Sequence, residues 1–287
     1  MQLGVVFPQT EIGNDPVAIR DFVQAVEGLG LAHLVIYDHV LGADPDRPGG
    51  WQGPYDKDTP FHEPFVTLGY LAAVTHSIEL VTGIIILPQR QTVLVAKQAA
   101  EVDLLSGGRL RLGVGTGWNP VEYQGLGMSF RDRGRRQEEQ VRLLRELWEN
   151  DTISFESRDH TIDRAGINPR PARRIPIWFG GAADALLRRA ARIGDGWIPI
   201  LGPDDRGRAA VERVRGYLEA EGRDPAGFGI QALAQARGAD PDRWRKHAEA
   251  WRELGATHLA LATMGAGLRT PDEHVEAARR FRDAAAP

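Results

Sequence analysis

The residues of this chain best suited to chemistry are a histidine beside a carboxylate and two glycine-rich segments. Asp38 and His39 follow the apolar run 32–37, and an imidazole can exchange protons near neutral pH. Of the eight histidines, His39 combines the end of an expected strand with an adjacent carboxylate. We therefore predict an acid/base or hydrogen-bonding role for His39, with a structural histidine as the alternative.

The first glycine-rich segment begins with alternating apolar residues at 110–114, a pattern that predicts a strand. Gly115, Thr116 and Gly117 follow, and glycines at the end of a strand let a ligand approach the backbone closely. The dinucleotide pattern G-x-G-x-x-G is not matched, because Trp118 stands where its third glycine belongs. The segment suggests a phosphate or ring site, and a glycine turn without a ligand is the alternative.

The second glycine-rich segment joins the expected strand 175–179 to the expected helix 186–193. Gly180, Gly181 and Ala182 occupy this junction, where free N–H groups and the helix dipole favour an anion. We predict a phosphate cradle here. A tight turn that simply requires glycine is the alternative.

Two tryptophans at expected strand ends, Trp118 and Trp197, suit a position beside a planar ring, with ordinary packing as the alternative. The chain has no cysteine, and its histidines are too dispersed to suggest a metal site. The motifs H-E-x-x-H, G-x-S-x-G and the Walker lysine loop are also absent from the sequence. We expect no metal and no common hydrolase chemistry.

The composition is that of an ordinary globular protein. The chain has 287 residues, of which 42% are hydrophobic, and its formal net charge is −4. This charge gives no general attraction to nucleic acid, and no apolar run is long enough to suggest a membrane span or signal peptide. We expect a cytoplasmic protein whose partner is a small molecule, with neither nucleic acid nor membrane.

Strands and helices alternate along the whole chain, which predicts one domain over residues 1–287. Eight strands and eight helices form the pattern of an α/β fold of the closed (β/α)8 TIM-barrel type. Irregular segments at 41–62 and 119–133 and a small hairpin within 152–174 are expected insertions after strands. The expected strands lie at 2–7, 32–37, 78–87, 110–114, 175–179, 196–200, 228–233 and 258–262.

Such a barrel brings the candidate residues together, because its chemistry takes place at the carboxyl ends of the strands. Asp38 and His39, the segment 83–87, the segment 115–118, the pair at 180–181 and Trp197 all occupy such ends. We therefore predict one site at the mouth of the barrel.

The ordered set of motifs resembles the bacterial luciferase-like monooxygenase superfamily, in particular its branch that uses the deazaflavin coenzyme F420. The resemblance covers nearly the whole chain. It rests on Asp38-His39, TGIIILPQR at 82–90, AKQ at 96–98, LLSGGRL at 104–110, GVGTGW at 113–118, PIWFGG at 176–181 and GDGW at 194–197.

The resemblance implies a (β/α)8 barrel that holds a flavin-like ring at its strand ends. It places a non-prolyl cis peptide at Gly83-Ile84, against the back of the ring. It also implies that Asp38 and His39 face the edge of the ring, with His39 near the position of hydride transfer. The expected contacts to the ribityl and phosphate parts are Gly115, Thr116, Gly117, Gly180, Gly181 and Ala182.

The expected activity is hydride transfer between F420 and a small organic substrate. Reduction of an activated C=C or C=O fits best, and alcohol oxidation is the reverse reaction. Members that oxidise sugar phosphates carry a glutamate where this chain has Trp118, so that substrate class is disfavoured and His39 is expected to lack an acid partner. The alternatives are an FMN-dependent monooxygenase and a cofactor-binding protein without turnover.

Three further expectations complete the prediction. By analogy with the superfamily, the protein forms a homodimer through helices on one flank. The acidic tail of the coenzyme is expected to bind arginines 90, 131, 133, 135 and 136, with a solvated charged face as the alternative.

The substrate pocket is expected under the segments 41–62 and 122–133, where aromatic and methionine side chains gather. The alternative is that these side chains only pin the segments to the barrel. They are Trp51, Tyr55, Phe61, Tyr123 and Met128.

Overall fold

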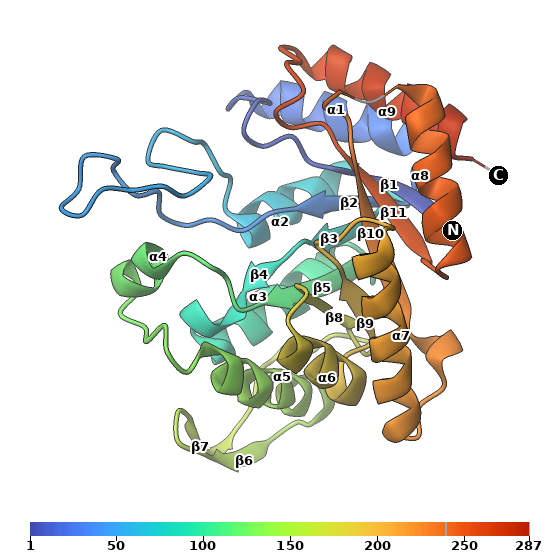
Figure 1. Ribbon diagram of the computed structural model, residues 1–287. Helices are drawn as coiled ribbons and strands as arrows, with labels where there is room; N and C mark the ends of the chain where they lie inside the picture. The colour runs from blue at the N-terminus through green and yellow to red at the C-terminus, as the bar shows by residue number, and fades with distance from the viewer. Residues whose placement is uncertain (239, 287) are drawn as a thin grey trace.

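Parallel strands close into an eight-membered barrel in the computed structural model, which describes residues 1–238 and 240–286 (Figure 1). One barrel position is shared by two short strands, β3 and β4, which pair with successive parts of β5. The predicted (β/α)8 fold is therefore confirmed. The strands are β1 (Gln2–Val6), β2 (His33–Ile36), β3 (Glu79–Thr82), β4 (Ile85–Ile86), β5 (Leu110–Gly115), β8 (Ile177–Gly180), β9 (Gly196–Ile198), β10 (Gly229–Gln235) and β11 (His258–Ala262).

The barrel closes where its first strand pairs with its last, two parts of the chain that are far apart in sequence. β1 pairs in parallel with both β2 and β11, so that Gly4 lies opposite His33 on one side and Ala260 on the other. β3 pairs with β5, where Leu80 lies opposite Leu110. Every pairing in this sheet is parallel, so the carboxyl ends of all its strands meet at one mouth.

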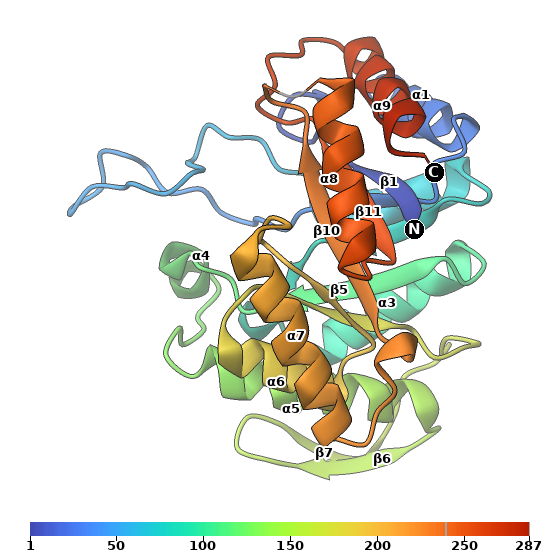
Figure 2. The same cartoon turned by 45° about the vertical axis from the view of Figure 1, so that its right-hand side comes forward.

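Helices surround the barrel because each buries an apolar face against the strands (Figure 2). Several begin with a capping residue followed by proline, as at Asp15 before Pro16, which satisfies free N–H groups of the first turn. Among the described residues, no helix combines the length and hydropathy that crossing a bilayer requires. The outer helices are α1 (Pro16–Gly28), α2 (Pro64–Val74), α3 (Thr92–Leu105), α5 (Arg133–Glu149), α6 (Asp184–Ile193), α7 (Asp205–Ala220), α8 (Pro241–Glu253) and α9 (Pro271–Ala285).

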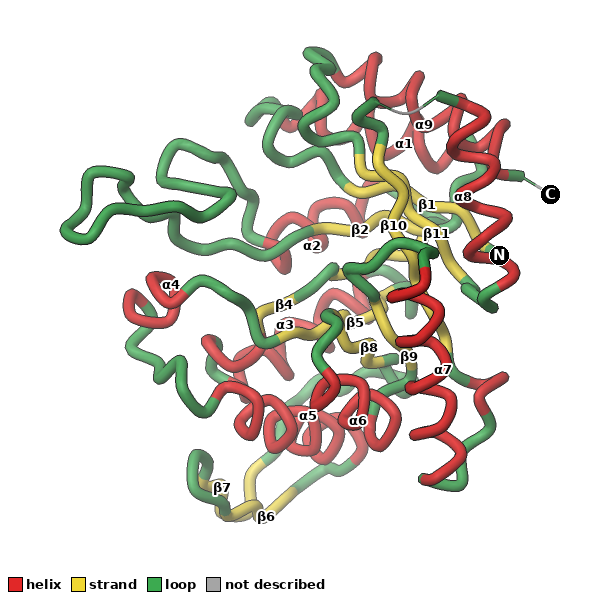
Figure 3. Tube along the Cα trace, viewed as in Figure 1, coloured by secondary structure: helices red, strands yellow, loops and turns green. Residues whose placement is uncertain are grey.

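Two insertions extend from the mouth of the barrel. The loop over residues 41–62, between β2 and α2, projects to the left in Figure 1, and Figure 3 shows it without regular structure. The short helix α4 (Pro120–Gly125) follows β5 and lies beside the start of this loop (Figure 1). We expected an irregular segment there, and the one-turn helix was missed.

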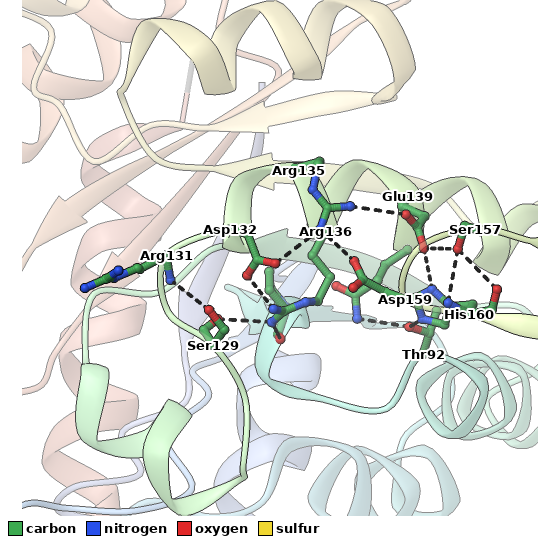
Figure 4. Close-up of polar contacts among 12 residues, drawn as sticks. Thr92, Ser129, Arg131, Asp132, Arg135, Arg136, Glu139, Ser157, Asp159 and His160 are labelled. Carbon is green, nitrogen blue, oxygen red and sulfur yellow. Dashed lines mark hydrogen bonds and ion pairs between the residues drawn. The ribbon is translucent and has the colours of Figure 1, made fainter.

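The predicted hairpin is present as β6 (Ile153–Glu156) and β7 (Thr161–Ala165), and polar contacts tie it to the barrel (Figure 4). Its His160 contacts Thr92 of α3 through Nε2 at 2.6 Å and Glu139 of α5 through Nδ1 at 2.6 Å. Burial raises the pKa of Glu139, but hydrogen bonds from Ser157 and His160 outweigh it and hold that pKa below its ordinary value. The hairpin is thus anchored to two helices.

The opposite end of the barrel is filled with side chains. The Arg111 guanidinium lies 4.1 Å from the centroid of the Trp178 ring, and the rings of His33 and His258 are 5.3 Å apart. Burial, reinforced by Arg111, lowers the pKa of both histidines, and that of His258 falls to about 3. This floor leaves the mouth as the end of the barrel where a ligand can enter.

Candidate functional site

A cavity of about 290 Å³ opens at the mouth between β4, β5, β8 and β9, and we call it the glycine cavity. It brings together nine of the residues predicted to hold a cofactor, from three separate parts of the chain. They are Gly83, Ile84, Gly115, Thr116, Gly117, Trp118, Gly180, Gly181 and Ala182. The remaining lining residues are Ala183, Leu186, Ile198 and Ile200.

The back of the glycine cavity is formed by the link between β3 and β4. The peptide bond between Gly83 and Ile84 is cis, as the resemblance implied. The Ile84 side chain lies over the neighbouring strands: a Cβ at Gly115 would lie 2.6 Å from Ile84 Cδ1, and one at Gly180 would lie 2.5 Å from its Cγ2. These two glycines therefore make room for Ile84, which is a different reason from the close ligand approach expected from sequence.

The predicted phosphate cradle is held rigidly from β9. Gly181 donates its N–H to the Ile198 carbonyl at 3.1 Å and accepts a hydrogen bond from Trp197 Nε1 at 2.7 Å. Its φ of 134° lies in the region that favours glycine. The Gly181 N–H is thus not free, whereas the N–H groups of Ala182 and Ala183 have no acceptor among the described residues. The free donors lie one residue further toward α6 than predicted.

Trp197 does not flank the cavity, so that prediction is corrected. Its side chain is fully buried and is absent from the cavity lining. Residues on a strand point alternately to opposite sides, and β9 turns the neighbouring Ile198 toward the cavity instead. The Trp197 side chain instead supports Gly181 by donating its Nε1–H to the Gly181 carbonyl.

Asp38 also has a different position from the one predicted. Its buried carboxylate accepts the Ile86 N–H at 2.9 Å through Oδ2 and binds Arg90 at 3.1 Å through Oδ2 and at 2.6 Å through Oδ1. Burial lowers the pKa of Arg90, but Asp38 and Glu63 raise it further, so it lies above its ordinary value. Asp38 therefore holds β4 and the following turn in place, with both carboxylate oxygens already occupied by protein donors.

His39 points to a partner that the sequence did not reveal. Its Nδ1 lies 3.3 Å from Oε2 of Glu122, and Oε1 of the same carboxylate accepts the Val40 N–H at 2.8 Å. Glu122 is fully buried and comes from α4. The expectation that His39 lacks an acid partner was wrong. The available signal was Asn119-Pro120, which caps a short helix and brings Glu122 toward β2.

Aromatic side chains enclose the His39 ring. The ring centroids of Tyr55, Phe61 and Trp118 lie 5.0, 4.7 and 5.8 Å from that of His39. Trp51 stacks on Trp118 at 5.8 Å with an interplanar angle of 27°. The loop at 41–62 therefore lies over His39, with Tyr55 and Phe61 against the imidazole ring.

The other two residues of the predicted substrate pocket lie elsewhere. Tyr123 is buried, and its hydroxyl donates to the Thr116 carbonyl at 2.7 Å, which pins α4 to the end of β5. Met128 lines a separate cavity of about 770 Å³ beside the β6–β7 hairpin. For Tyr123, the alternative that the side chain pins its segment to the barrel is therefore correct.

Most of the arginines predicted to bind an acidic tail already have partners. Arg135 contacts Asp159 at 2.9 Å and Asp132 at 3.1 Å (Figure 4). The buried Arg136 donates to Asp132 and to the Pro88 carbonyl. Two others are placed differently: Arg133 stacks on Phe130 at 3.8 Å, and Arg131 is exposed. Like Arg90, Arg135 and Arg136 are therefore structural cations in this arrangement.

Residues 1–286 match the family model described as luciferase-like monooxygenase. The chain belongs to this family. The protein is therefore an oxidoreductase, and its cis peptide at Gly83-Ile84 is the one that the resemblance implied.

Relatives of this luciferase-like protein use both deazaflavin and flavin. An uncharacterized protein of Mycobacterium tuberculosis is 39% identical over 223 residues, covering 76% of this chain and 77% of the relative. An F420-dependent glucose-6-phosphate dehydrogenase of Kineococcus radiotolerans is 30% identical over 214 residues, 72% of this chain and 60% of that enzyme. An FMNH2-dependent dimethylsulfone monooxygenase of Pseudomonas fluorescens is 30% identical over 185 residues, which cover 63% of this chain and 50% of that enzyme.

A solved structure shows the same fold over the full length. An F420-dependent secondary alcohol dehydrogenase superposes with a TM-score of 0.81 at 17% identity, covering 100% of this chain and 99% of that one. This likeness supports the barrel and its insertions.

Proposed function

We propose that this luciferase-like protein is an F420-dependent oxidoreductase that acts on a small, uncharged organic molecule. The observation that carries the proposal is the glycine cavity itself, which collects backbone groups from the link between β3 and β4, from β5 and from β8, at the mouth of the barrel that also carries His39. The F420-dependent relative supports the choice of coenzyme.

The residues present fit a ribityl phosphate bound along the glycine cavity. The N–H groups of Ala182 and Ala183 are free at the start of α6, whose dipole favours a negative charge. Gly115, Thr116 and Gly117 offer backbone on the opposite wall. The apolar face of Ile84 would lie behind the ring. When bound, the deazaflavin supplies or accepts a hydride.

The substrate class follows from the charge of the cavity beside His39. This separate cavity of about 260 Å³ is lined by Asp56 and Lys57 as well as His39, and Lys57 already pairs with Asp58 at 2.9 Å. Its described lining therefore offers a phosphorylated or carboxylate substrate no unpaired lysine or arginine. His39 stands at the same mouth, covered by aromatic rings, and is suited to exchange a proton with an oxygen of the substrate. Reduction of an activated C=C or C=O, or oxidation of an alcohol, meets these conditions.

The coenzyme is tested by titrating the protein with oxidised F420 and with FMN under identical conditions, using equilibrium dialysis. We expect F420 to bind more tightly. Tighter binding of FMN would refute the proposal in favour of a flavin-dependent monooxygenase, the second candidate, which is motivated by the FMNH2-dependent relative.

The phosphate cradle offers a sharper test through one backbone donor. Ala183 has a φ of −68°, which proline can adopt, so Ala183→Pro removes the free N–H and retains the backbone angle. We expect the affinity for the bound coenzyme to fall about tenfold or more, as for loss of a hydrogen bond to a charged group. Ala183→Ser retains the N–H and serves as the control. Equal affinity in both variants would show that the phosphate lies elsewhere.

We also propose that the protein forms a homodimer through α2 and α3. These neighbouring helices expose Val66 at 73% and Leu94 at 51%. Sedimentation equilibrium tests this, and a monomer at micromolar concentration would contradict it.

A further inference from the structure

We propose that Glu122 is the positioning residue for His39: it keeps the proton of the neutral imidazole on Nδ1 and leaves Nε2 free for the substrate. The importance of this arrangement for turnover rests on the proposed function. The arrangement itself can be measured without any cofactor.

The orientation of the Glu122 carboxylate is set by the backbone. Oε1 accepts the Val40 N–H at 2.8 Å, so Oε2 is the atom that faces His39 Nδ1 at 3.3 Å. An ionised carboxylate has no proton to donate, so Nδ1 must be the donor of this hydrogen bond. Since a neutral imidazole carries one proton, Nε2 is then an acceptor.

The ring of His39 has little freedom to leave this position. Tyr55, Phe61 and Trp118 contact it, and its side chain is only 14% exposed. Nε2 has no hydrogen-bond partner in the part of the chain that the structure describes, unlike Nδ1. One nitrogen is therefore committed to Glu122 and the other is available.

This arrangement suits a group that must take up or give a proton at one defined atom. In alcohol oxidation, Nε2 of neutral His39 would take the hydroxyl proton, and a bound deazaflavin would supply the hydride acceptor. In the reverse direction, the imidazolium gives the proton back to the oxygen. In both directions the charged imidazolium faces the buried carboxylate of Glu122, which offsets its charge.

The decisive variant is Glu122→Gln, because the backbone also orients its amide. The Val40 N–H still requires an acceptor, so the amide oxygen takes the place of Oε1 and the NH2 group faces His39 Nδ1. Nδ1 must then accept, and the ring proton moves to Nε2. The variant therefore reverses the tautomer without changing the size of the side chain.

The tautomer is measured from the ¹⁵N shifts of the His39 ring in the protein without cofactor, at a pH where the ring is neutral. His39→Gln identifies the signals by removing them, and Glu101→Gln is the control, since Glu101 is exposed on α3. We expect Nδ1–H in the wild type and the control, and Nε2–H in Glu122→Gln. Nε2–H in the wild type, or no change in the variant, would overturn the proposal. Dispersed amide signals show that each variant is folded.

Turnover gives the second readout, with reduced F420 and cyclohexenone as the probe substrate. We expect kcat of Glu122→Gln to fall about 100-fold, with KM changed less than about threefold. In a His39→Gln background, Glu122→Gln should cause no further loss, because it acts through His39. A reversed tautomer with unchanged kcat overturns the positioning role. If the wild type does not oxidise reduced F420 at all, the proposed function fails, and the tautomer measurement alone decides on Glu122.

Discussion

Replacing Asp38 by asparagine distinguishes a structural from a ligand-binding role at the mouth of the barrel. The buried Asp38 carboxylate accepts hydrogen bonds from Ile86 N–H and from two atoms of Arg90. Asparagine keeps one acceptor oxygen and removes the charge, leaving Arg90 with Glu63 alone at 3.0 Å. Breaking a buried ion pair costs about 3 to 5 kcal/mol. We therefore expect Asp38→Asn to lower the free energy of unfolding by about 3 kcal/mol.

Urea unfolding followed by circular dichroism measures this loss. With an m-value on the order of 3 kcal/mol/M, the midpoint would fall by about 1 M. Glu63→Gln is the matched control, since Glu63 is 35% exposed, and we expect a change of about 1 kcal/mol or less. The reasoning is refuted if Asp38→Asn leaves stability within about 0.5 kcal/mol of the wild type while abolishing coenzyme binding. In that case Asp38 contacts the ring, as the family resemblance implied.

Three further predictions test the floor, the cradle and the back of the cavity. In the folded protein the pKa of His258 is about 3, below its ordinary value of 6.5. Between pH 6.5 and about pH 3 the unfolded chain therefore binds more protons at this histidine than the folded protein does, and the free energy of unfolding falls as the pH falls. His258→Gln should flatten this dependence in urea unfolding between pH 7 and pH 4, and an unchanged slope would contradict it. Trp197→Phe leaves the Gly181 carbonyl without its donor and should cost about 1 to 3 kcal/mol in thermal unfolding; an unchanged melting temperature would mean that the bond contributes nothing. Gly180→Ala should cost about 1 to 3 kcal/mol through overlap with Ile84, and adding Ile84→Ala should restore part of the loss; no recovery would place the clash elsewhere.

The barrel and its mouth could be predicted because they depend on patterns along the chain. Apolar periodicity separates strands from helices, and a parallel barrel then gathers all strand ends at one side. For this reason Gly83, Gly115 and Gly180, which are distant in sequence, were correctly expected in one place.

The errors concern the direction of side chains and contacts between distant segments. Asp38 and His39 are neighbours in the sequence, but the Asp38 side chain points toward Arg90 and the His39 side chain points toward Glu122 of α4. No local pattern distinguishes these directions at the end of a strand, where the regular alternation stops. Glu122 was missed for a related reason: it lies 83 residues from His39, in a helix too short for apolar periodicity to reveal.

The double anchoring of Gly181 to β9 has a consequence for how the choice of coenzyme can change. Because the Gly181 N–H is bound to the Ile198 carbonyl and the Gly181 carbonyl to Trp197 Nε1, the peptide units on both sides of Gly181 are held in place before a ligand binds. A ribityl group bearing a phosphate is common to F420 and FMN, so a rigid template for that group contributes to the affinity for both. Discrimination between the two must arise where they differ, at the ring and beyond the phosphate. Mutations that exchange one coenzyme for the other are therefore expected around His39 and the outer rim, with the template left intact.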